Sequence, residues 1–306
     1  MKILVTGGAG FIGSHIVGGL LKDGHQVIIV DNLSTGHERN LNAQARFYKL
    51  DIRDAEKLDE VFSKERPDIV NHHAAQTDVR RSMSDPIFDA QVNVMGSLNI
   101  FNLSIKYGVK KVTFASSSAI YSDKIPLPLH ESQGGDPVSV YGLTKYIGEL
   151  YLRLFYDTYG LSYTAFRYGN VYGPRQDPHG ENGVVAIFIG QMRSGIRPTI
   201  FGDGSKTRDY IYIDDVVKAN LIAIRNPDSG GIFNLGSGSE IADLEVFNTV
   251  RNLLGVRIEP IFSSKRPGEA DRVCLNIDKA ETQLAWEPSI RFSEGVALTL
   301  QLYQPT

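Results

Sequence analysis

The sequence predicts an α/β protein in which a doubly wound parallel sheet is joined by a smaller C-terminal α/β region. Over the first two-thirds of the chain, short runs rich in β-branched residues alternate with longer amphipathic runs, which is typical of β-α-β units. A glycine-rich segment follows the first of these strands, and polar residues follow several others. Parallel strands need long crossover connections, so the amphipathic runs are predicted to be helices flanking the sheet.

The first expected domain spans residues 1–168 and contains this alternation. The predicted strands are Lys2–Thr6, Gln26–Asp31, Arg46–Leu50, Asp68–His73, Lys110–Ser117 and Ser162–Tyr168. The predicted helices are Phe11–Asp23, Ala55–Lys64, Ile87–Tyr107 and Val140–Tyr159.

The second expected domain spans mainly residues 169–306 and begins with a Gly/Pro/Asn-rich stretch in which the chain leaves the sheet. A segment near residues 212–240 is expected to return to the first domain, with Ile232–Leu235 as one more strand of the main sheet. A turn-rich segment is predicted around Phe201–Gly204, and a small edge strand is an equal interpretation of Thr199–Phe201. The predicted helices are about Val184–Arg193, Asp214–Asn226, Leu244–Leu254, Asp278–Leu284 and Phe292–Tyr303.

Composition excludes several classes of protein. The chain has 306 residues, 42% of them hydrophobic and 22% charged, and a net charge of −3, so it provides no overall positive field for nucleic acid or an anionic membrane. Its one cysteine, Cys274, allows no disulfide or thiolate zinc site within the chain. No apolar run is long enough to cross a membrane, and no signal peptide is expected. We therefore expect a soluble cytoplasmic protein without a metal, nucleic-acid or membrane partner.

The segment Gly7-Gly8-Ala9-Gly10-Phe11-Ile12-Gly13 follows a predicted strand and begins a predicted helix. In such a turn Gly7 permits the tight bend, Gly10 the close approach of a phosphate, and Gly13 close packing of helix on strand. The first N–H groups of the helix would then face a pyrophosphate. Glycines that only form a turn are the alternative interpretation.

Polar residues at other strand ends support a nucleotide site. Asp31 ends the second strand where a carboxylate would accept hydrogen bonds from an adenosine ribose and repel a 2′-phosphate, which favours NAD over NADP. Asp51 ends the third strand and would either bind the adenine amino group or cap the next helix. His73 ends the fourth strand, where small residues follow. The carboxyl ends of parallel strands share one edge, which is where open α/β sheets bind ligands.

A second set of residues predicts redox chemistry at the same edge. Ser117 ends the fifth strand, and Tyr141 and Lys145 lie four residues apart on the helix that follows. A phenol with a pKa of about 10 can act as a base near pH 7 only if its pKa is lowered by roughly 3 units; a neighbouring ammonium and a nicotinamide ring would favour the phenolate. A second Tyr-x-x-x-Lys match, at Tyr107 and Lys111, leads into the opposite end of the fifth strand.

Together, Gly7-x-x-Gly10-x-x-Gly13, the serine-rich strand end and Tyr141-x-x-x-Lys145 resemble the extended short-chain dehydrogenase/reductases, which have a Rossmann-like fold. The resemblance covers essentially the whole chain and is nearest to the UDP-glucose (UDP-galactose) 4-epimerases. Further similar segments are Asp31-Asn32-Leu33-Ser34-Thr35-Gly36, Arg167–Arg175, Thr207–Ile211 and Arg266-Pro267-Gly268-Glu269.

The resemblance implies a role for each matching residue. Tyr141 would be the catalytic base and acid, Lys145 would lower its pKa and bind the nicotinamide ribose, and Ser117 would bind the sugar hydroxyl, although Ser116 and Ser118 are adjacent. The implied NAD-binding residues are Gly7, Gly10, Phe11, Ile12, Gly13, Asp31, Asn32, Ser34, Thr35, Gly36, Asp51, Ile52, His73, Ala74, Ala75, Gln76, Asn93 and Tyr168. The other implied substrate-binding residues are Asn170, Val184, Val185, Ile200, Phe201, Gly202, Arg208, Arg266 and Glu269.

The implied reaction interconverts UDP-glucose and UDP-galactose through a transient 4-keto sugar, with bound NAD regenerated in each cycle. Arginine forks suit the diphosphate, although surface salt bridges from Arg208 to Asp209 and from Arg266 to Glu269 are the alternative. A 4-ketosugar reductase, a UDP-glucuronate epimerase and an inactive NAD sensor remain alternatives. A 4,6-dehydratase is disfavoured because Ser118-Ala119 offers no carboxylate for elimination.

Two further expectations concern the substrate and the assembly. Val273 and Cys274 are small, which leaves N-acetylated hexoses as alternative substrates. The resemblance implies a homodimer formed by helices beside the sheet. The helices Ile87–Tyr107 and Val140–Tyr159 carry aromatic residues on more than one face, and core packing explains some of them. These residues are Phe88, Phe101, Tyr151, Phe155 and Tyr159.

Overall fold

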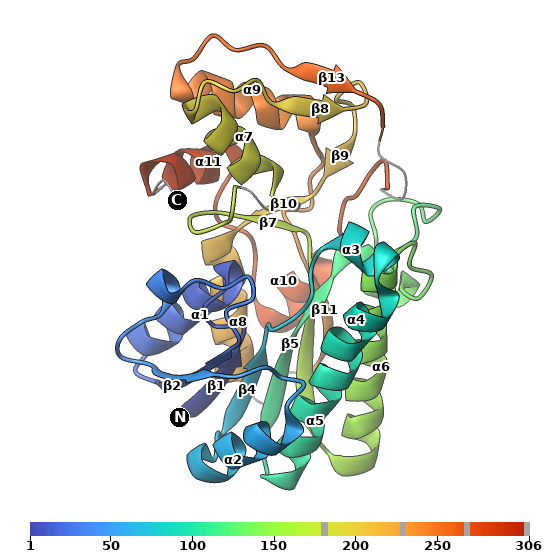
Figure 1. Ribbon diagram of the computed structural model, residues 1–306. Coiled ribbons are helices and arrows are strands. Elements are labelled where there is room, and N and C mark those ends of the chain that lie inside the picture. Colours follow the sequence, from blue (N-terminus) through green and yellow to red (C-terminus); the bar gives the residue numbers. More distant parts are fainter. Residues whose placement is uncertain (179–182, 227–229, 266–269, 303–306) are drawn as a thin grey trace.

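The computed structural model describes residues 1–178, 183–226, 230–265 and 270–302. Its centre is a parallel sheet of seven strands in the order β11-β6-β5-β4-β1-β2-β3 (Figure 1). These strands are β1 (Lys2–Thr6), β2 (Gln26–Asp31), β3 (Arg46–Lys49), β4 (Ile69–His72), β5 (Lys111–Ser117), β6 (Ser162–Tyr168) and β11 (Gly231–Leu235). The expected doubly wound sheet is therefore confirmed, including the return of a late segment, β11, beside β6.

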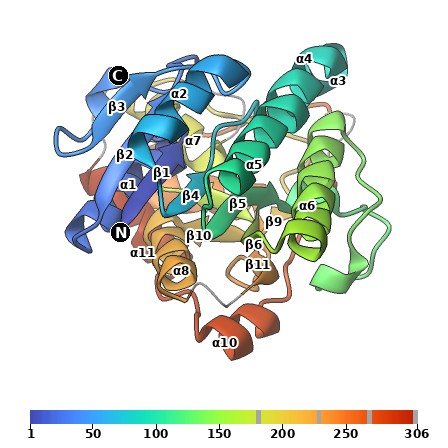
Figure 2. The same cartoon turned by 90° about the horizontal axis from the view of Figure 1, so that it is seen from below.

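Helices cover both faces of this sheet, as Figure 2 shows from below. On one face, α1 packs against α8; α2, α5 and α6 lie on the other. Alternation within β1 explains the two layers, because Ile3 and Val5 enter the core with α1 whereas Leu4 enters the core with α2 and α5. These helices are α1 (Phe11–Lys22), α2 (Ala55–Glu65), α5 (Ser97–Lys106), α6 (Val140–Tyr159) and α8 (Ile213–Arg225).

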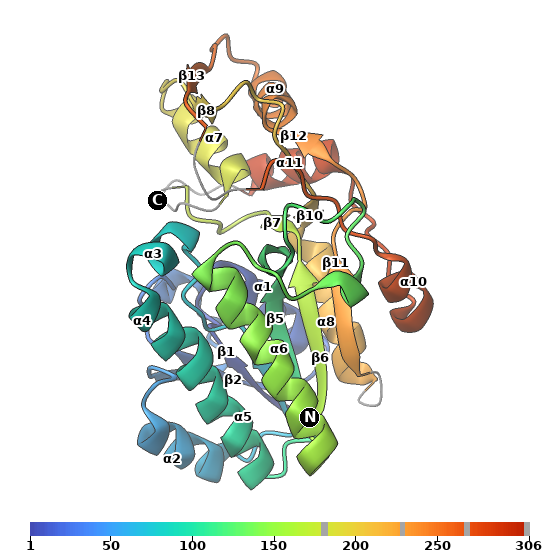
Figure 3. The same cartoon turned by 90° about the vertical axis from the view of Figure 1, so that its right-hand side faces the viewer.

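The remaining elements gather mainly beyond the carboxyl edge of the sheet, where β7 and β10 form a parallel pair between the sheet and the C-terminal elements (Figures 1 and 3). Two further small pairs are β8 with β13 and β9 with β12. The strands are β7 (Asn170–Tyr172), β8 (Thr199–Phe201), β9 (Thr207–Arg208), β10 (Tyr210–Tyr212), β12 (Ile241–Ala242) and β13 (Ile261–Ser263). The helices are α7 (Val184–Arg193), α9 (Asp243–Leu254), α10 (Asp278–Leu284) and α11 (Phe292–Gln301).

The main departure from the predicted elements concerns the helix expected over Ile87–Tyr107. The helical run begins earlier, as α4 (Pro86–Ala90), passes through a π-helical turn at Gln91–Gly96, and continues as α5. The short helix α3 (Val79–Ser84) and the small strands β7, β9, β10, β12 and β13 were not expected. Their hydrophobic runs are too short to show a period.

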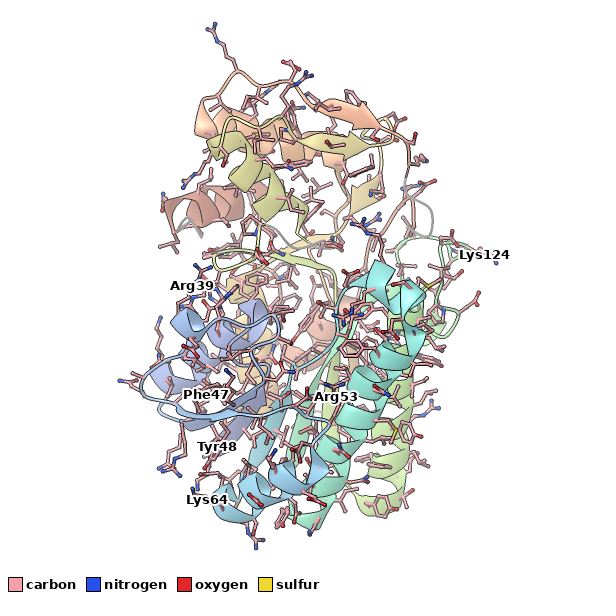
Figure 4. All side chains as sticks on the ribbon, viewed as in Figure 1. Arg39, Phe47, Tyr48, Arg53, Lys64 and Lys124 are labelled. Carbon is pink, nitrogen blue, oxygen red and sulfur yellow. The ribbon has the colours of Figure 1, made fainter. Side chains whose placement is uncertain are left out.

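β3 is an edge strand of the sheet, and Lys64 of α2 lies next to it. Lys64 extends over the Tyr48 ring, at 5.7 Å from its centroid, and both side chains are labelled in Figure 4. A charged side chain over an edge strand discourages pairing with another chain. Among the described residues, no helix is long and apolar enough to pass through a bilayer.

Candidate active site

The glycine-rich turn lies where β1 meets α1, and its shape depends on missing side chains. Gly7 has φ +70°, and a Cβ there would lie 2.7 Å from the Ala74 nitrogen. A Cβ on Gly13 would lie 2.1 Å from the Gly7 oxygen. Gly10 is the N-cap of α1 and provides no side-chain cap, so the first N–H groups of the helix, at Phe11 and Ile12, lack partners within it. This turn has the form of a phosphate cradle.

Asp31 is almost fully buried at the end of β2. Its carboxylate accepts hydrogen bonds from the Ala9 N–H at 2.9 Å and the Leu33 N–H at 2.8 Å, and each oxygen can accept a further bond. Gly36 packs close to it, since a Cβ there would lie 3.0 Å from Asp31 Oδ1. Ser34 and Thr35 are exposed on the loop between them. The acidic group is therefore fixed beside the glycine turn.

Asp51 lies after β3 and pairs with Arg53, which Figure 4 labels. Hydrogen bonds from Arg53 lower the pKa of Asp51 to about 2. Asn32 donates to the same carboxylate at 2.8 Å, which connects the ends of β2 and β3. The alternative that Asp51 caps the next helix is wrong, because Asp54 accepts from the Lys57 N–H at the start of α2.

The loop after β4 passes close to the glycine turn. The N–H groups of His73 and Ala74 donate to the Thr6 hydroxyl at 3.2 and 3.1 Å, and Ala75 follows in a partly buried position. His73 Nε2 lies 3.0 Å from the Tyr168 hydroxyl, which connects the ends of β4 and β6. Burial lowers the pKa of His73 to about 3, so its imidazole is neutral near pH 7.

Three residues implied to bind NAD have buried side chains. Ile52 belongs to the hydrophobic core. Gln76 Nε2 donates to Asp89 at 2.8 Å, and Asn93 Nδ2 donates to the Gln76 carbonyl at 2.9 Å. Asn93 Oδ1 accepts from the Gln76 N–H at 2.8 Å. The hydrogen bonds of Gln76 with Asn93 and Asp89 fix the loop after β4 from its buried side.

Ser117, Tyr141 and Lys145 come together at the carboxyl end of β5. The Ser117 hydroxyl lies close to the Tyr141 phenol and acts to lower its pKa. The neighbouring Ser116 is buried and donates to Glu149 at 2.5 Å, so Ser117 is the serine paired with the phenol. Ser139 caps α6 by accepting from the Gly142 N–H, which fixes the first turn of the helix that carries Tyr141.

The pKa of Tyr141 differs from the sequence-based expectation. Burial raises it to about 12, and the nearby Ser117 hydroxyl only partly opposes this. Lys145 does not provide the expected lowering in the chain alone. Its ammonium donates to the Ala115 carbonyl at 2.8 Å and lies 5.8 Å from the centroid of the Tyr141 ring, and burial lowers its pKa to about 8.

The residues implied to bind substrate lie in the region beyond the sheet edge. Asn170 begins β7, and Val184 and Val185 form the first turn of α7, whose N-cap Gly183 has no side chain to cap it. Ile200 is buried in β8, Phe201 ends that strand, and Gly202 follows with φ +90°. Arg266 and Glu269 lie outside the described residues.

Arg208 is partly buried in β9 and donates to the Thr207 carbonyl at 2.7 Å. The alternative interpretation of Arg208, a surface salt bridge to Asp209, is wrong because Asp209 does not lie at the surface. Asp209 is fully buried, and its carboxylate accepts from the N–H groups of Ser237, Gly238 and Leu275.

Sequence reasoning missed a buried ion pair beneath the serines. Arg167 of β6 and Glu149 of α6 form a bidentate pair, with Nε···Oε1 at 2.9 Å and NH2···Oε2 at 2.7 Å. Arg167 also donates to the Tyr121 hydroxyl at 2.9 Å, and Tyr121 donates to Asn234 of β11 at 2.6 Å. The available signal was an arginine within an otherwise apolar strand, which in a buried position requires a partner.

The fold and this edge define a Rossmann-type protein of the extended short-chain dehydrogenase/reductase class. The chain fits a dinucleotide there, because the cradle that a Cβ would fill lies beside the Asp31 carboxylate and the Ser117–Tyr141 pair occupies the same edge. More specifically, the chain belongs to the NAD dependent epimerase/dehydratase family, whose sequence profile matches residues 3–236.

Solved structures are similar over nearly the whole chain. The UDP-glucose 4-epimerase of Thermotoga maritima, solved with UDP-glucose, is 46% identical and covers 99% of this chain and 98% of its own, with a TM-score of 0.96. The Thermus thermophilus UDP-glucose 4-epimerase, in complex with NAD, is 41% identical with the same coverage and a TM-score of 0.94. UDP-N-acetylglucosamine 4-epimerase from Methanobrevibacter ruminantium M1 is 36% identical, covers 98% of this chain and 97% of its own, and has a TM-score of 0.93.

Proposed function

We propose that this chain is an NAD-dependent nucleotide-sugar 4-epimerase that interconverts UDP-glucose and UDP-galactose. The observation that carries the proposal is that Ser117 and Tyr141 lie together at the end of β5, one helical turn from Lys145 and on the same sheet edge as the glycine cradle. Similarity to UDP-glucose 4-epimerases over nearly the full chain supports this substrate class.

In this proposal Tyr141 removes the proton of the C4 hydroxyl as that carbon is oxidised, and returns it when the 4-keto sugar is reduced on its other face. Ser117 donates to the same sugar oxygen and keeps it within reach of the phenol. When bound, NAD supplies the oxidising and reducing equivalents and a positively charged ring. That ring would favour the phenolate against the burial that raises the pKa of Tyr141.

Lys145 would bind the nicotinamide ribose, and Asp31 the adenosine ribose. The Asp31 carboxylate is fixed by two backbone N–H groups, so a 2′-phosphate would meet a negative charge that cannot turn away. This favours NAD over NADP. Asp51, held by Arg53, is proposed to lie at the adenine end of the same site.

The diphosphate of the substrate would bind Arg208 and Arg266, with Asn170, Glu269, α7 and β8 forming the rest of its site. Guanidinium groups suit this role because a chain with a net charge of −3 must meet a diphosphate with local cations. This binding would keep the nucleotide in place while the keto sugar turns over. Residues 1–168 with α8 and β11 would then form mainly the NAD domain, and residues 169–306 mainly the nucleotide-sugar domain.

The test is to purify the full chain, measure NAD released on denaturation, and add UDP-galactose without added cofactor. We expect NAD to co-purify and UDP-glucose to appear, with no net change in NAD redox state. Turnover that requires NADPH or an added 4-keto sugar would instead indicate a reductase. NAD without any turnover would favour an inactive sensor.

N-acetylated hexoses are a second candidate substrate class. Cys274 and Val273 are both partly buried, and neither has a large side chain, and a UDP-N-acetylglucosamine 4-epimerase is among the similar structures. Measuring UDP-N-acetylglucosamine and UDP-glucuronate beside UDP-glucose decides this. Undetectable turnover of the N-acetylated sugar beside rapid UDP-glucose turnover would contradict it.

A homodimer is proposed through α4, α5 and α6, and of the aromatic residues first considered Tyr159 is exposed on α6. Phe101 and Phe155 are core residues. The other exposed hydrophobic side chains are Ile87 and Met95 on the α4–α5 run and Leu143, Leu154 and Tyr156 on α6. Residues eleven apart share one side of a helix, so Leu143 and Leu154 face the same way. We expect a dimer by light scattering and a monomer for Leu154→Arg.

A further inference from the structure

Asp89 carries a buried carboxylate that the proposed chemistry leaves unexplained. Its side chain is fully buried and accepts hydrogen bonds from the Thr144 hydroxyl at 2.6 Å, Gln76 Nε2 at 2.8 Å and Asn93 Nδ2 at 3.2 Å. All three donors are neutral. Within the described parts of the chain, the ion pairs include none to this carboxylate. Burial of a carboxylate without a cation in contact is costly, so its position calls for a reason.

The three donors come from three parts of the candidate active site. Gln76 belongs to the loop after β4 that passes the glycine turn, and Asn93 lies in the π-helical turn before α5. Thr144 is in the first turns of α6, between Tyr141 and Lys145. The Thr144 hydroxyl is also 3.1 Å from the Tyr141 carbonyl. The carboxylate therefore joins the loop after β4 to the helical turn that carries the phenol and the ammonium.

Asp89 also acts on that turn through its charge. Burial lowers the pKa of Lys145 to about 8, and the Asp89 charge opposes this lowering. The same charge raises the pKa of Tyr141, in the same direction as burial. Asp89 thus favours the protonated form of both groups without contacting either ionisable atom.

The other titratable groups named here around Lys145 are neutral or paired near pH 7, so Asp89 is the group whose charge acts on Lys145. His72 of β4 is buried and His73, which follows it, is partly buried, and both have lowered pKa values, so both are neutral near pH 7. One turn further along α6, Glu149 is paired with Arg167 of β6. The phenol is neutral while its proton is bound.

We propose that Asp89 is a positioning residue for the epimerase reaction: it fixes the Thr144 turn of α6 and supplies the negative charge that keeps Lys145 an ammonium. This inference rests on the proposed function for its effect on turnover. Its effect on Lys145 is a property of the folded chain and can be measured without substrate.

The first experiment compares pH profiles of kcat/KM for the holoenzyme and Asp89→Asn. Turnover needs the phenolate and the ammonium together, so ionisation of Tyr141 sets the acid limb and deprotonation of Lys145 the alkaline limb. Removing a negative charge lowers both pKa values. Both limbs are expected to move to lower pH by about one unit. A lower rate with both limbs unmoved would mean that the carboxylate only packs, and would overturn the charge role.

The second experiment measures unfolding in urea from pH 6.5 to 9.5, without substrate. The pKa of Lys145 is lowered in the folded chain, so the unfolded chain holds more protons above about pH 8 and stability rises with pH there. In Asp89→Asn this rise is expected to begin about one pH unit lower. The Asp89→Asn/Lys145→Met double variant should show no such rise. An unchanged onset in Asp89→Asn would overturn the proposal even if the enzyme turned over a different sugar.

Thr144→Val separates position from charge, because it keeps the carboxylate and removes the hydroxyl that joins it to α6. We expect kcat to fall about tenfold with KM and both pH limbs unchanged. Unchanged kcat would overturn the positioning role. Asp89→Ser is the second variant without the charge, and leaves room for a water between the three donors. If neither charge-free variant folds, the Thr144→Val result alone decides whether Asp89 acts on turnover through α6.

Discussion

The chain contains two Tyr-x-x-x-Lys segments whose surroundings differ completely. At Tyr107 and Lys111, the tyrosine ends α5 and donates to Asp59 at 2.9 Å, and the buried lysine donates to the carbonyls of Ala223 and Asn226 at 2.9 Å each. At Tyr141 and Lys145, both residues lie within α6. There the phenol meets a serine hydroxyl and the ammonium has a lowered pKa.

The difference lies in which end of β5 each segment approaches. Lys111 is the first residue of β5, at its amino end, whereas Tyr141 follows the carboxyl end, where Ser117 lies. At the amino end the lysine connects the sheet to the C-terminal end of α8, and its donors are satisfied by backbone carbonyls. At the carboxyl end the polar groups meet the edge used for ligands in open α/β sheets. The same Tyr-x-x-x-Lys spacing therefore has a structural role at the amino end of β5 and a proposed catalytic role at its carboxyl end.

The largest expected contrast is between Tyr141→Phe and Tyr107→Phe. Removing the Tyr141 hydroxyl should lower kcat about 10³-fold, because the proton acceptor is lost, while the folded chain should still bind NAD. Tyr107→Phe should keep full activity and lose about 1 kcal/mol of stability with its hydrogen bond. Turnover assays and urea unfolding of both variants make the comparison. Equal activity of the two variants would contradict the assignment of Tyr141.

The second contrast pairs Lys145→Met with Lys111→Met. The first should lower kcat about 10²-fold and weaken NAD retention, because an ammonium beside the phenol is removed. The second removes the donor to the Ala223 and Asn226 carbonyls, of which the first is buried, and should destabilise the chain by about 3 kcal/mol, with activity retained below its lower melting temperature. Loss of activity in both at full stability would show that the two lysines do not divide these roles.

A smaller contrast lies within β5 itself, between Ser117→Ala and Ser116→Ala. Loss of the Ser117 hydroxyl should lower kcat about tenfold or more, because the sugar oxygen loses a donor. Loss of the Ser116 hydroxyl removes a bond to the buried Glu149 carboxylate and should cost about 2 kcal/mol of stability, with kcat nearly unchanged. The opposite pattern would exchange the roles of the two serines.

The smallest expected effect is a pH dependence of stability. The pKa of Lys145 falls from 10.5 to about 8 on folding, so below pH 8 both states hold the proton and stability does not depend on this group. Between pH 8 and 9.5 the folded chain should gain about 2 kcal/mol over Lys145→Met. Tyrosines hardly titrate in this range. Identical slopes for both proteins would mean that Lys145 keeps an ordinary pKa.

The sequence was sufficient for the sheet and for the side chains at its edge, because both depend on local patterns. Short β-branched runs and Gly7, Gly10 and Gly13 predicted where β1 ends and α1 begins, and strand ends predicted that Asp31, Ser117 and Tyr141 share one edge. It was not sufficient for the partners of buried polar groups. Asp89 lies 55 residues from Thr144, and no local period indicates that contact.

Electrostatics was also beyond the sequence. The expectation that Lys145 lowers the pKa of Tyr141 depended on helical spacing alone, and burial outweighs it in the folded chain. The contact between Arg53 and Asp51 depends on side-chain rotamers that a sequence pattern does not contain, and Asp54 rather than Asp51 caps α2.

The return of the chain in β11 has a consequence for how the protein is made. β11 pairs with β6 along its whole length, from Thr164 to Tyr168, and α8 covers α1. A chain that has left the ribosome only as far as residue 168 therefore has an unpaired edge at β6, and only α1 on the face that α1 later shares with α8. Nascent chains paused there should recruit a chaperone, and a stable cofactor-loaded fragment should appear only once the codons for residues 213–235 have been translated and their segment has left the exit tunnel.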